Sequence, residues 1–220
     1  MAKVPARGRP VFSRVYAKYA GPALEKAGVS EHRRRLVAGL SGEVIEIGAG
    51  NGLNFPFYPP AVSRLLAVEP EPRLRALAGR RADGMVVRTE VVDGTAERLP
   101  APDASFDAAV VSLALCSVAD PAAALAEVHR VLRPGGRLHF FEHVRADSPR
   151  MRTVQRLLDA TVWPPLCGGC HTGRDTLGSI RAAGFDVTEL DRFRFPDTAV
   201  PTPAATHILG TAVRPPGAAR

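Results

Sequence analysis

A carboxylate near the end of an apolar run is followed at once by three closely spaced glycines. Glu46 lies in the run 44–47, and the next five residues read Gly-Ala-Gly-Asn-Gly. Glycine lets a chain turn sharply out of a strand, and it lets a ligand approach the backbone where a Cβ would block it. We therefore expect this loop to form the floor of a cofactor site. The residues expected to contact the cofactor here are Glu46, Gly48, Ala49, Gly50, Asn51, Gly52 and Asn54.

The spacing of these glycines separates two kinds of cofactor. Dinucleotide-binding loops read G-x-G-x-x-G and hold a pyrophosphate at a helix N-terminus, whereas the third glycine here comes one residue early. S-adenosylmethionine has an amino group and a sulfonium but no phosphate, so the acid at Glu46 matches it better than it matches a pyrophosphate. The loop thus predicts S-adenosylmethionine as cofactor and S-adenosylhomocysteine as product. A tight turn without a ligand is the alternative.

A second acid ends the next apolar run. Glu69-Pro70 follows residues 65–68, at the place where a strand of an open α/β sheet would hold ribose hydroxyls. Dehydrogenases also have an acid here, so Glu69 and Pro70 indicate a nucleoside cofactor without selecting one. An exposed charge at a strand end is the alternative.

Five motifs together resemble the class I S-adenosylmethionine-dependent methyltransferases, over roughly residues 10–214. They are Val44-Ile-Glu-Ile-Gly-Ala-Gly-Asn-Gly52, Val68-Glu-Pro70, Gly94-Thr-Ala-Glu-Arg-Leu-Pro100, Ser105-Phe-Asp107 and Glu127-Val-His-Arg-Val-Leu-Arg-Pro-Gly-Gly136. The resemblance implies an α/β, Rossmann-like, doubly wound sheet of seven strands, mostly parallel with an antiparallel last strand. It also implies that Gly94, Thr95, Ala96 and Glu97 lie near the adenine, although Thr95 stands where the family usually has an acid.

Apolar periodicity divides the chain into elements of one domain, residues 1–220. We expect an N-terminal helical cover (1–40), a cofactor-binding core (41–145), a substrate-covering insertion (146–175), a C-terminal helix and strands (176–214), and a tail (215–220). Helices are expected at 12–27, 31–40, 73–81, 122–132 and 176–183, and strands at 44–47, 65–68, 85–92, 108–112, 137–142, 185–193 and 208–213. In related enzymes an aromatic residue of the cover lines the methionine end of the cofactor, which makes Tyr16 and Tyr19 candidates.

Two loops should face the transferred methyl group, because ligands of open α/β sheets bind at the carboxyl ends of the strands. The expected residues are Ser112 and Leu113 beside the cofactor and Leu115, Cys116, Glu142 and His143 beside the substrate. His143 could accept a proton from a nucleophile, since an unperturbed imidazole has a pKa near 6.5. Cys116 and His143 are therefore candidate catalytic residues. A small apolar role for the cysteine and a structural role for the histidine are the alternatives.

The motif Cys167-Gly-Gly-Cys-His171 has the spacing of haem attachment and of half a zinc site. Covalent haem needs export, which the N-terminal sequence does not support, and no second C-x-x-C supplies the remaining zinc ligands. We therefore expect no metal. Trp163, Cys167, Cys170 and His171 are instead expected to line a small apolar substrate pocket, with His171 as a further catalytic candidate.

Composition limits the class of protein and its partners. A chain of 220 residues that is 45% apolar can bury a full core, and three cysteines are too few for a secreted disulfide framework. There is no apolar run of 18 residues and no signal peptide, so we expect a cytoplasmic protein without a membrane anchor. The net charge of +7 is spread along the chain with little aromatic interleaving, which disfavours a nucleic-acid substrate. The sequence leaves the oligomeric state open.

A narrower resemblance concerns the methyl acceptor. Asn54-Phe-Pro-Phe-Tyr-Pro-Pro60, Leu115-Cys-Ser-Val118, Arg133-Pro-Gly-Gly136, Glu142-His-Val144 and Gly169-Cys170 resemble the methyltransferase-like thiol S-methyltransferases. This resemblance implies in-line methyl transfer to a small-molecule thiol. The alternatives are O-, N- or C-methylation of a quinone or another secondary metabolite, a cofactor-binding protein without turnover, and a nicotinamide-dependent dehydrogenase.

Overall fold

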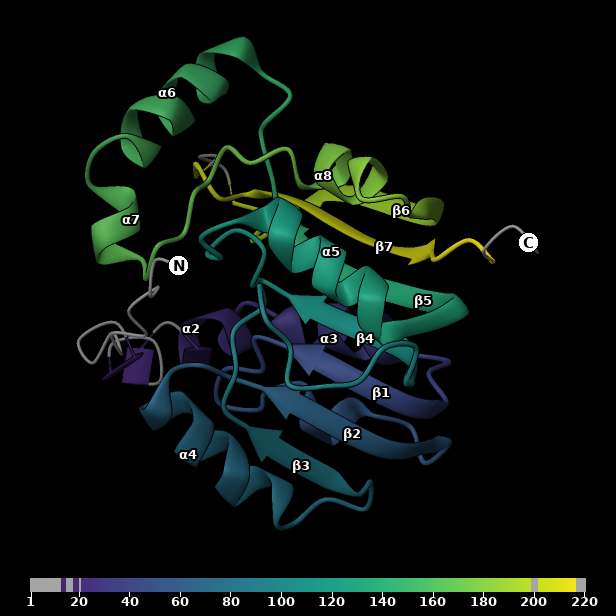
Figure 1. Cartoon of the computed structure of the whole chain (residues 1–220). Coiled ribbons are helices and arrows are strands. Elements are labelled where there is room, and N and C mark those ends of the chain that lie inside the picture. Colours follow the sequence, from purple (N-terminus) through teal and green to yellow (C-terminus); the bar gives the residue numbers. More distant parts are fainter. Residues whose placement is uncertain (1–12, 15–17, 20, 199–201, 217–220) are drawn as a thin grey trace, which may run out of the picture.

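Seven strands form one sheet in the computed structural model, which describes residues 13, 14, 18, 19, 21–198 and 202–216 (Figure 1). The strand order is β3-β2-β1-β4-β5-β7-β6. The first five strands are parallel, and β7 is antiparallel to both of its neighbours, β5 and β6. The predicted Rossmann-like fold with an antiparallel last strand is confirmed. The strands are β1 (Gly42–Ile47), β2 (Val62–Val68), β3 (Thr89–Val92), β4 (Phe106–Ser112), β5 (Leu132–His143), β6 (Asp186–Arg194) and β7 (Thr206–Val213).

Helices cover both faces of this sheet. The helices are α2 (Gly21–Lys26), α3 (Val29–Val37), α4 (Pro72–Ala82), α5 (Pro121–Val131), α6 (Pro149–Asp159), α7 (Trp163–Leu166) and α8 (Thr176–Ala182), with a 3-10 turn, η2 (Phe55–Phe57). Leu125 of α5 and Ile180 of α8 belong to the apolar core on one face. Leu36 of α3 and Ala78 of α4 belong to the core on the other. The central strands are buried on both sides, which explains why they read as continuous apolar runs.

The start of α5 shows how the sequence sets an element's boundary. Asp120 is the N-cap, and its carboxylate accepts hydrogen bonds from the N–H groups of Ala122 and Ala123 at 3.0 and 3.1 Å. Pro121 occupies the first turn, where a missing N–H costs nothing. Because both signals precede the apolar periodicity, this helix is predictable from sequence and begins close to the expected residue.

Other boundaries differ from the expected ones. β3 begins at Thr89 rather than at residue 85, because the N–H of Met85 donates to the carbonyl of Ala82 and the chain is still turning there. β5 begins at Leu132, ahead of the expected residue 137, because Gly135 and Gly136 exchange backbone hydrogen bonds with Arg214. The helix α6 within residues 146–175 was not predicted.

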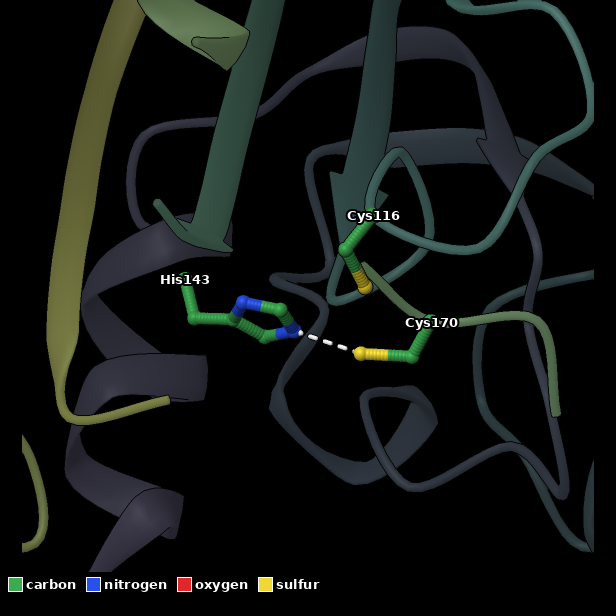
Figure 2. Close-up of side chains that lie close together, drawn as sticks. All are labelled: Cys116, His143 and Cys170. Carbon is green, nitrogen blue, oxygen red and sulfur yellow. Dashed lines mark hydrogen bonds between the residues drawn. The ribbon is translucent and has the colours of Figure 1, made fainter. Parts of the chain in front are cut away.

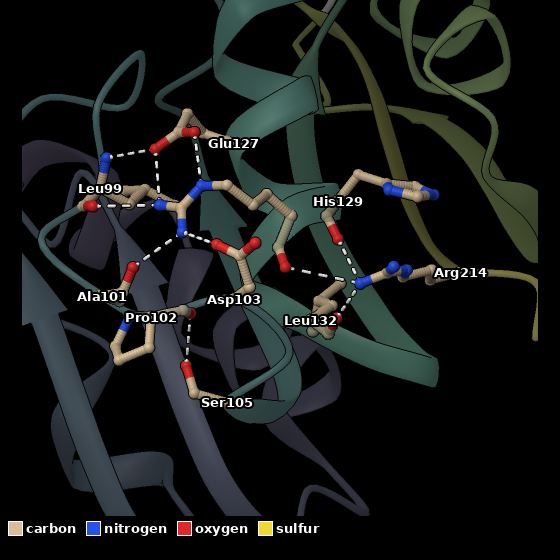
Figure 3. Close-up of polar contacts among 10 residues, drawn as sticks. Leu99, Ala101, Pro102, Asp103, Ser105, Glu127, His129, Leu132 and Arg214 are labelled. Carbon is tan, nitrogen blue, oxygen red and sulfur yellow. Dashed lines mark hydrogen bonds and ion pairs between the residues drawn. The ribbon is translucent and has the colours of Figure 1, made fainter. Parts of the chain in front are cut away.

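The end of β7 is tied to the junction between α5 and β5. Arg214 Nη1 donates to the carbonyl of His129 at 2.9 Å and also to that of Leu132 (Figure 3). In the same region Glu127 accepts a hydrogen bond from the Leu99 N–H at 2.8 Å. The Arg214 contacts fix the antiparallel strand β7 to the amino end of β5 and to α5, and the Glu127 contact fixes α5 to the segment before β4.

The N-terminal cover is only partly within the described residues. Tyr16 lies outside them, as do residues 12, 15, 17 and 20 of the expected helix 12–27, whereas α2 lies in the second half of that range and α3 follows it. None of the helices in the described part of the chain has the length and apolar character needed to cross a bilayer.

Candidate functional site

The glycine loop follows β1 and packs closely against the loop after β4. A Cβ on Gly48 would lie 2.6 Å from the Cβ of Ala114, and Gly48 has φ +71°. Gly50 has φ +58° and no neighbour that an added Cβ would meet within 4 Å. The loop therefore has a crowded side and an open side, as expected of a backbone cradle for a ligand.

Glu46 is buried beneath this loop, with 1% of its surface exposed. Its carboxylate accepts hydrogen bonds from Asn54 Nδ2 at 2.7 Å and from Tyr58 Oη at 3.0 Å. Burial raises its pKa to about 7, although both hydrogen bonds favour the anion. Arg33 of α3 donates to Asn54 Oδ1 at 2.7 Å and extends the network.

Arg33 and Tyr58 are parts of this network that sequence reasoning did not identify. Arg33 lies within the run Arg33-Arg34-Arg35, which reads as solvent-exposed charge, yet Arg33 is 3% exposed. The signal that could have separated it is its position on the apolar side of α3, beside Leu36 and Val37.

Glu69 follows the end of β2, as predicted, and its carboxylate faces the glycine loop. Its Oε2 accepts the N–H of Gly50 at 2.8 Å, and its Oε1 accepts the N–H of Glu71 at 2.9 Å. Burial raises the pKa of this carboxyl group. The carboxyl ends of β1 and β2 are thereby joined through one side chain, next to Pro70.

The segment 94–97 follows β3. Thr95 forms an isolated bridge with Arg98, and Glu97 Oε1 accepts the N–H groups of Ala119 and Asp120 at 2.9 and 3.3 Å. Glu97 thus orders the entry to α5, and Ala96 is part of the core, while Gly94 packs against Pro100 and Val68.

The loop after β4 is held by a buried carboxylate from β5. Glu142 is fully buried and accepts the N–H groups of Ala114, Leu115 and Cys116 at 2.7, 2.9 and 3.2 Å. Burial raises its pKa, and these three donors oppose that change. Sequence analysis expected Glu142 to line the substrate pocket, and the structure gives this carboxylate a role in fixing the backbone of the loop.

Ser112 ends β4, and Leu113 begins the loop that follows it. The Oγ of Ser112 is buried and has no hydrogen-bond partner among the described residues. Leu113 has φ +54°, a conformation that a leucine rarely adopts, and its N–H donates to the carbonyl of Phe141 at 2.7 Å. A polar atom without a partner beside the glycine loop fits a site that a polar ligand completes.

Cys116, His143 and Cys170 form a buried cluster of two thiols and an imidazole (Figure 2). Their ligand atoms all lie within 4.8 Å of one another. His143 Nε2 is 3.1 Å from Cys170 Sγ, and Trp163 Nε1 donates to the same sulfur at 3.3 Å. Contact with Cys116 and burial raise the pKa of the Cys170 thiol, so the thiol form is favoured in this environment. We refer to these three residues as the sulfur cluster.

The segment after α7 is anchored over the loop that carries Cys116. The N–H of His171 donates to the carbonyl of Cys116 at 2.9 Å, and Arg174 Nη2 donates to the carbonyl of Val118 at 2.8 Å. Gln155 of α6 is fully buried and donates to the carbonyl of Thr172 at 2.9 Å. Helix α6 therefore supports the segment that delivers Cys170.

The remaining predicted residues lie outside the sulfur cluster. Cys167 is half-buried, and His171 Nδ1 lies 2.8 Å from the carbonyl of Gly169 with Arg174 beside it. Tyr19 is 60% exposed, and the Lys18 ammonium is 5.2 Å from the centre of its ring.

The arrangement brings a backbone cradle, buried carboxylates and a pair of thiols to one edge of the sheet. The first two features fit a nucleoside with a cationic group, because the backbone can approach the ligand and Glu46 can supply an anion. The sulfur cluster lies at the ends of β4 and β5, on the same edge. The site can therefore hold a nucleoside cofactor beside a buried cluster of two thiols and an imidazole.

Comparisons with known proteins agree with this geometry. A family model described as a methyltransferase domain matches residues 45–140. The thiol S-methyltransferase TMT1B of Rattus norvegicus is 36% identical over 182 residues, which are 80% of this chain and 73% of the relative. TMT1B of Homo sapiens is 34% identical over 183 residues, or 81% and 74% of the two chains.

More distant proteins share the fold or part of the sequence. The ubiquinone/menaquinone biosynthesis C-methyltransferase UbiE of Methylobacterium nodulans is 32% identical over 126 residues, covering 57% of this chain and 45% of the relative. A crystal structure from Thermotoga maritima, described as an S-adenosylmethionine-dependent methyltransferase and possible histamine N-methyltransferase, has a TM-score of 0.68. It is 23% identical and covers 93% of this chain and 99% of that chain.

Proposed function

The chain belongs to the class I S-adenosylmethionine-dependent methyltransferases, with thiol S-methyltransferases among its relatives, and from this premise we propose that it methylates the sulfur of a small thiol. The observation that carries the proposal is the sulfur cluster at the ends of β4 and β5, beside the cofactor cradle. The thiol S-methyltransferase TMT1B matches 80% of the chain at 36% identity, whereas two quinone C-methyltransferases match 57% and 69% of it at 32% and 28% identity.

The cofactor supplies an electrophilic methyl group when it is bound. We propose that Glu46 and the loop 48–52 hold its methionine end and that Glu69 lies near its ribose. The remaining proposed cofactor contacts are Tyr16, Tyr19, Asn54, Pro70, Gly94, Thr95, Ala96, Glu97, Ser112 and Leu113. Holding the acceptor about 3 Å from the methyl carbon can contribute ~7–11 kcal/mol through orientation alone.

The acceptor must also become a thiolate. A thiol has a pKa near 8.5, so only a few per cent is ionised at neutral pH. Two histidines near Cys116 can serve this step. His143 is the first candidate because its ring reaches Cys170, and His171 is the second because its backbone is bound to Cys116. Leu115, Cys116, Glu142, Trp163, Cys167 and Cys170 are the remaining proposed residues around the substrate.

The test is release of S-adenosylhomocysteine with a panel of small thiols, phenols, amines and quinols. The proposal expects turnover with thiols and its loss in Glu46→Ala, with retained folding checked by circular dichroism. Turnover confined to oxygen, nitrogen or carbon acceptors would replace it with methylation of a quinone or another secondary metabolite. Cofactor binding without turnover on any acceptor would leave a non-catalytic binding protein.

A further inference from the structure

Three soft ligand groups meet in the sulfur cluster from three separate segments. Cys116 comes from the loop after β4, His143 ends β5, and Cys170 follows α7. Figure 2 shows the imidazole directed at Cys170, with the Cys116 sulfur beside it. All three residues are at most 9% exposed. The Cys167–His171 motif by itself lacks a full set of zinc ligands, but the fold brings Cys116 and His143 to Cys170 from other segments.

The spacing of these atoms suits a tetrahedral zinc site. Zn–S bonds of about 2.3 Å and Zn–N bonds of about 2.0 Å place neighbouring ligand atoms about 3.5–3.8 Å apart. The His143 Nε2 to Cys170 Sγ distance is 3.1 Å, and no pair in the cluster exceeds 4.8 Å. The three side chains therefore need to move by about 1 Å or less to coordinate one zinc ion. Two thiolates and an imidazole also select zinc, because calcium and magnesium prefer oxygen ligands.

We infer that Cys116, His143 and Cys170 bind one Zn²⁺ and leave its fourth position for the sulfur of the acceptor thiol. Sites with three protein ligands and one open position are the catalytic kind, and two cysteines with one histidine are an established set. The assignment of the fourth position rests on the proposed function, whereas the three protein ligands do not depend on it.

Neighbouring groups hold two of the ligands in position. Glu142 fixes the backbone N–H of Cys116, and Trp163 Nε1 donates to Cys170 Sγ. Such outer contacts orient metal ligands and tune the donor sulfur. Gln155 and Arg174 anchor the segment that carries Cys170. The ligands are thus supported by contacts from β5, α6 and α7.

A bound zinc ion would favour the thiolate form of the acceptor in this buried site. On metal binding, the thiols of Cys116 and Cys170 each release a proton to solvent. The acceptor thiol would bind as thiolate and release a third proton to solvent. Its sulfur then forms a bond to the methyl carbon, while the bond from that carbon to the cofactor sulfur breaks and leaves its electron pair on S-adenosylhomocysteine. The thioether product is neutral, binds zinc weakly and leaves the fourth position open again. In this mechanism His143 is a ligand and not the proton acceptor.

Metal binding can be measured without activity. Cobalt(II) added to the metal-free full-length protein should give the absorption of one tetrahedral cobalt with thiolate charge transfer, and one equivalent of zinc should displace it. Cys116→Ser, Cys170→Ser and His143→Ala should each lose stoichiometric binding, while Cys167→Ser, from the same motif but outside the cluster, should keep it. Absence of thiolate charge transfer in the wild type would overturn the site whether or not the variants fold. Equal loss in Cys167→Ser would assign the metal to the local motif and would also overturn it.

The fourth position needs its own measurement. A small thiol should change the cobalt spectrum of the wild-type protein, whereas the alcohol of the same carbon skeleton should not. An unchanged spectrum would make the ion structural and overturn its role with the acceptor. Thiol methylation at full rate by metal-free protein would overturn the zinc role while the proposed function stands. Stoichiometric cobalt binding, together with no methylation of any thiol by the zinc-loaded protein, would overturn the proposed function and the role of the fourth position, while the site of three protein ligands stands.

Discussion

At the scale of single residues, Glu46 connects cofactor binding to pH. Burial raises its pKa to about 7, so the side chain is neutral below that pH and anionic above it. The cofactor's cationic groups favour the anion, so the dissociation constant for S-adenosylmethionine should fall from about pH 6 to about pH 8. Calorimetric titration across this range checks the trend, and Glu46→Gln should remove it. An identical trend in that variant would assign the titration to another group.

The same carboxyl group has the opposite effect on the ligand-free protein. Its folded pKa exceeds the unfolded value of 4.5, so its contribution to the free energy of unfolding is complete below pH 4.5 and is lost as the pH rises through about 7. The loss is on the order of 3 kcal/mol. Urea unfolding at several pH values gives the free energy of unfolding of the wild type and of Glu46→Gln. Between pH 4.5 and about 7 this free energy should fall more steeply with pH in the wild type, and equal slopes would contradict the titration of Glu46.

Gly48 tests the close contact between the glycine loop and the loop after β4. Gly48→Ala brings a Cβ within 2.6 Å of the Ala114 Cβ, whereas Gly39 has a similar φ of +73° and nothing within 4 Å. Both substitutions impose the same backbone strain, but only Gly48→Ala displaces the loop. We expect Gly48→Ala to weaken S-adenosylmethionine binding at least about tenfold, or ~1.4 kcal/mol, and Gly39→Ala to leave it unchanged. Equal weakening by both would mean that strain, and not the contact, controls binding.

At the scale of elements, one buried side chain of helix α6, Gln155, connects the helix to three other segments of the chain. The Oε1 of Gln155 accepts the N–H of Ala146 at 2.9 Å, and its Nε2 donates to the carbonyls of Thr172 and Pro203 at 2.9 and 2.8 Å. Gln155→Ala leaves these buried groups without partners and should reduce the free energy of unfolding by about 2 kcal/mol or more.

The matched control for this prediction is Arg156→Ala, at the exposed neighbouring position of α6. It should change stability by less than about 0.5 kcal/mol. Limited proteolysis should cut residues 160–175 faster in Gln155→Ala than in the control. Equal cutting in both variants would show that α6 does not support this segment.

The elements also show what the sequence could and could not predict. The ends of β1, β2 and α5 are recognisable because Gly48, Glu69 and Asp120 mark them with local chemistry. The proximity of Cys116 and His143 follows from the adjacency of β4 and β5, which the fold class implies. The approach of Cys170 depends on α6 and on Gln155, whose contacts span 9 to 48 residues and leave no periodic signal.

At the scale of the whole molecule, cofactor binding should stabilise the fold selectively. A ligand at 100 times its dissociation constant adds about 2.7 kcal/mol to the free energy of unfolding. S-adenosylmethionine should therefore raise the thermal midpoint, whereas NAD⁺ and NADP⁺ should not, since the glycine spacing and Glu46 do not suit a pyrophosphate. Stabilisation by a nicotinamide cofactor alone would contradict the family assignment.

The most direct test of thiol methylation is the position of a transferred isotopic label. The protein receives S-adenosylmethionine with a deuterated methyl group and a small acceptor that carries both a thiol and a hydroxyl group. Mass spectrometry then locates the label within the product. We expect the label on sulfur, and label on oxygen, with the thiol intact, would rule out thiol methylation.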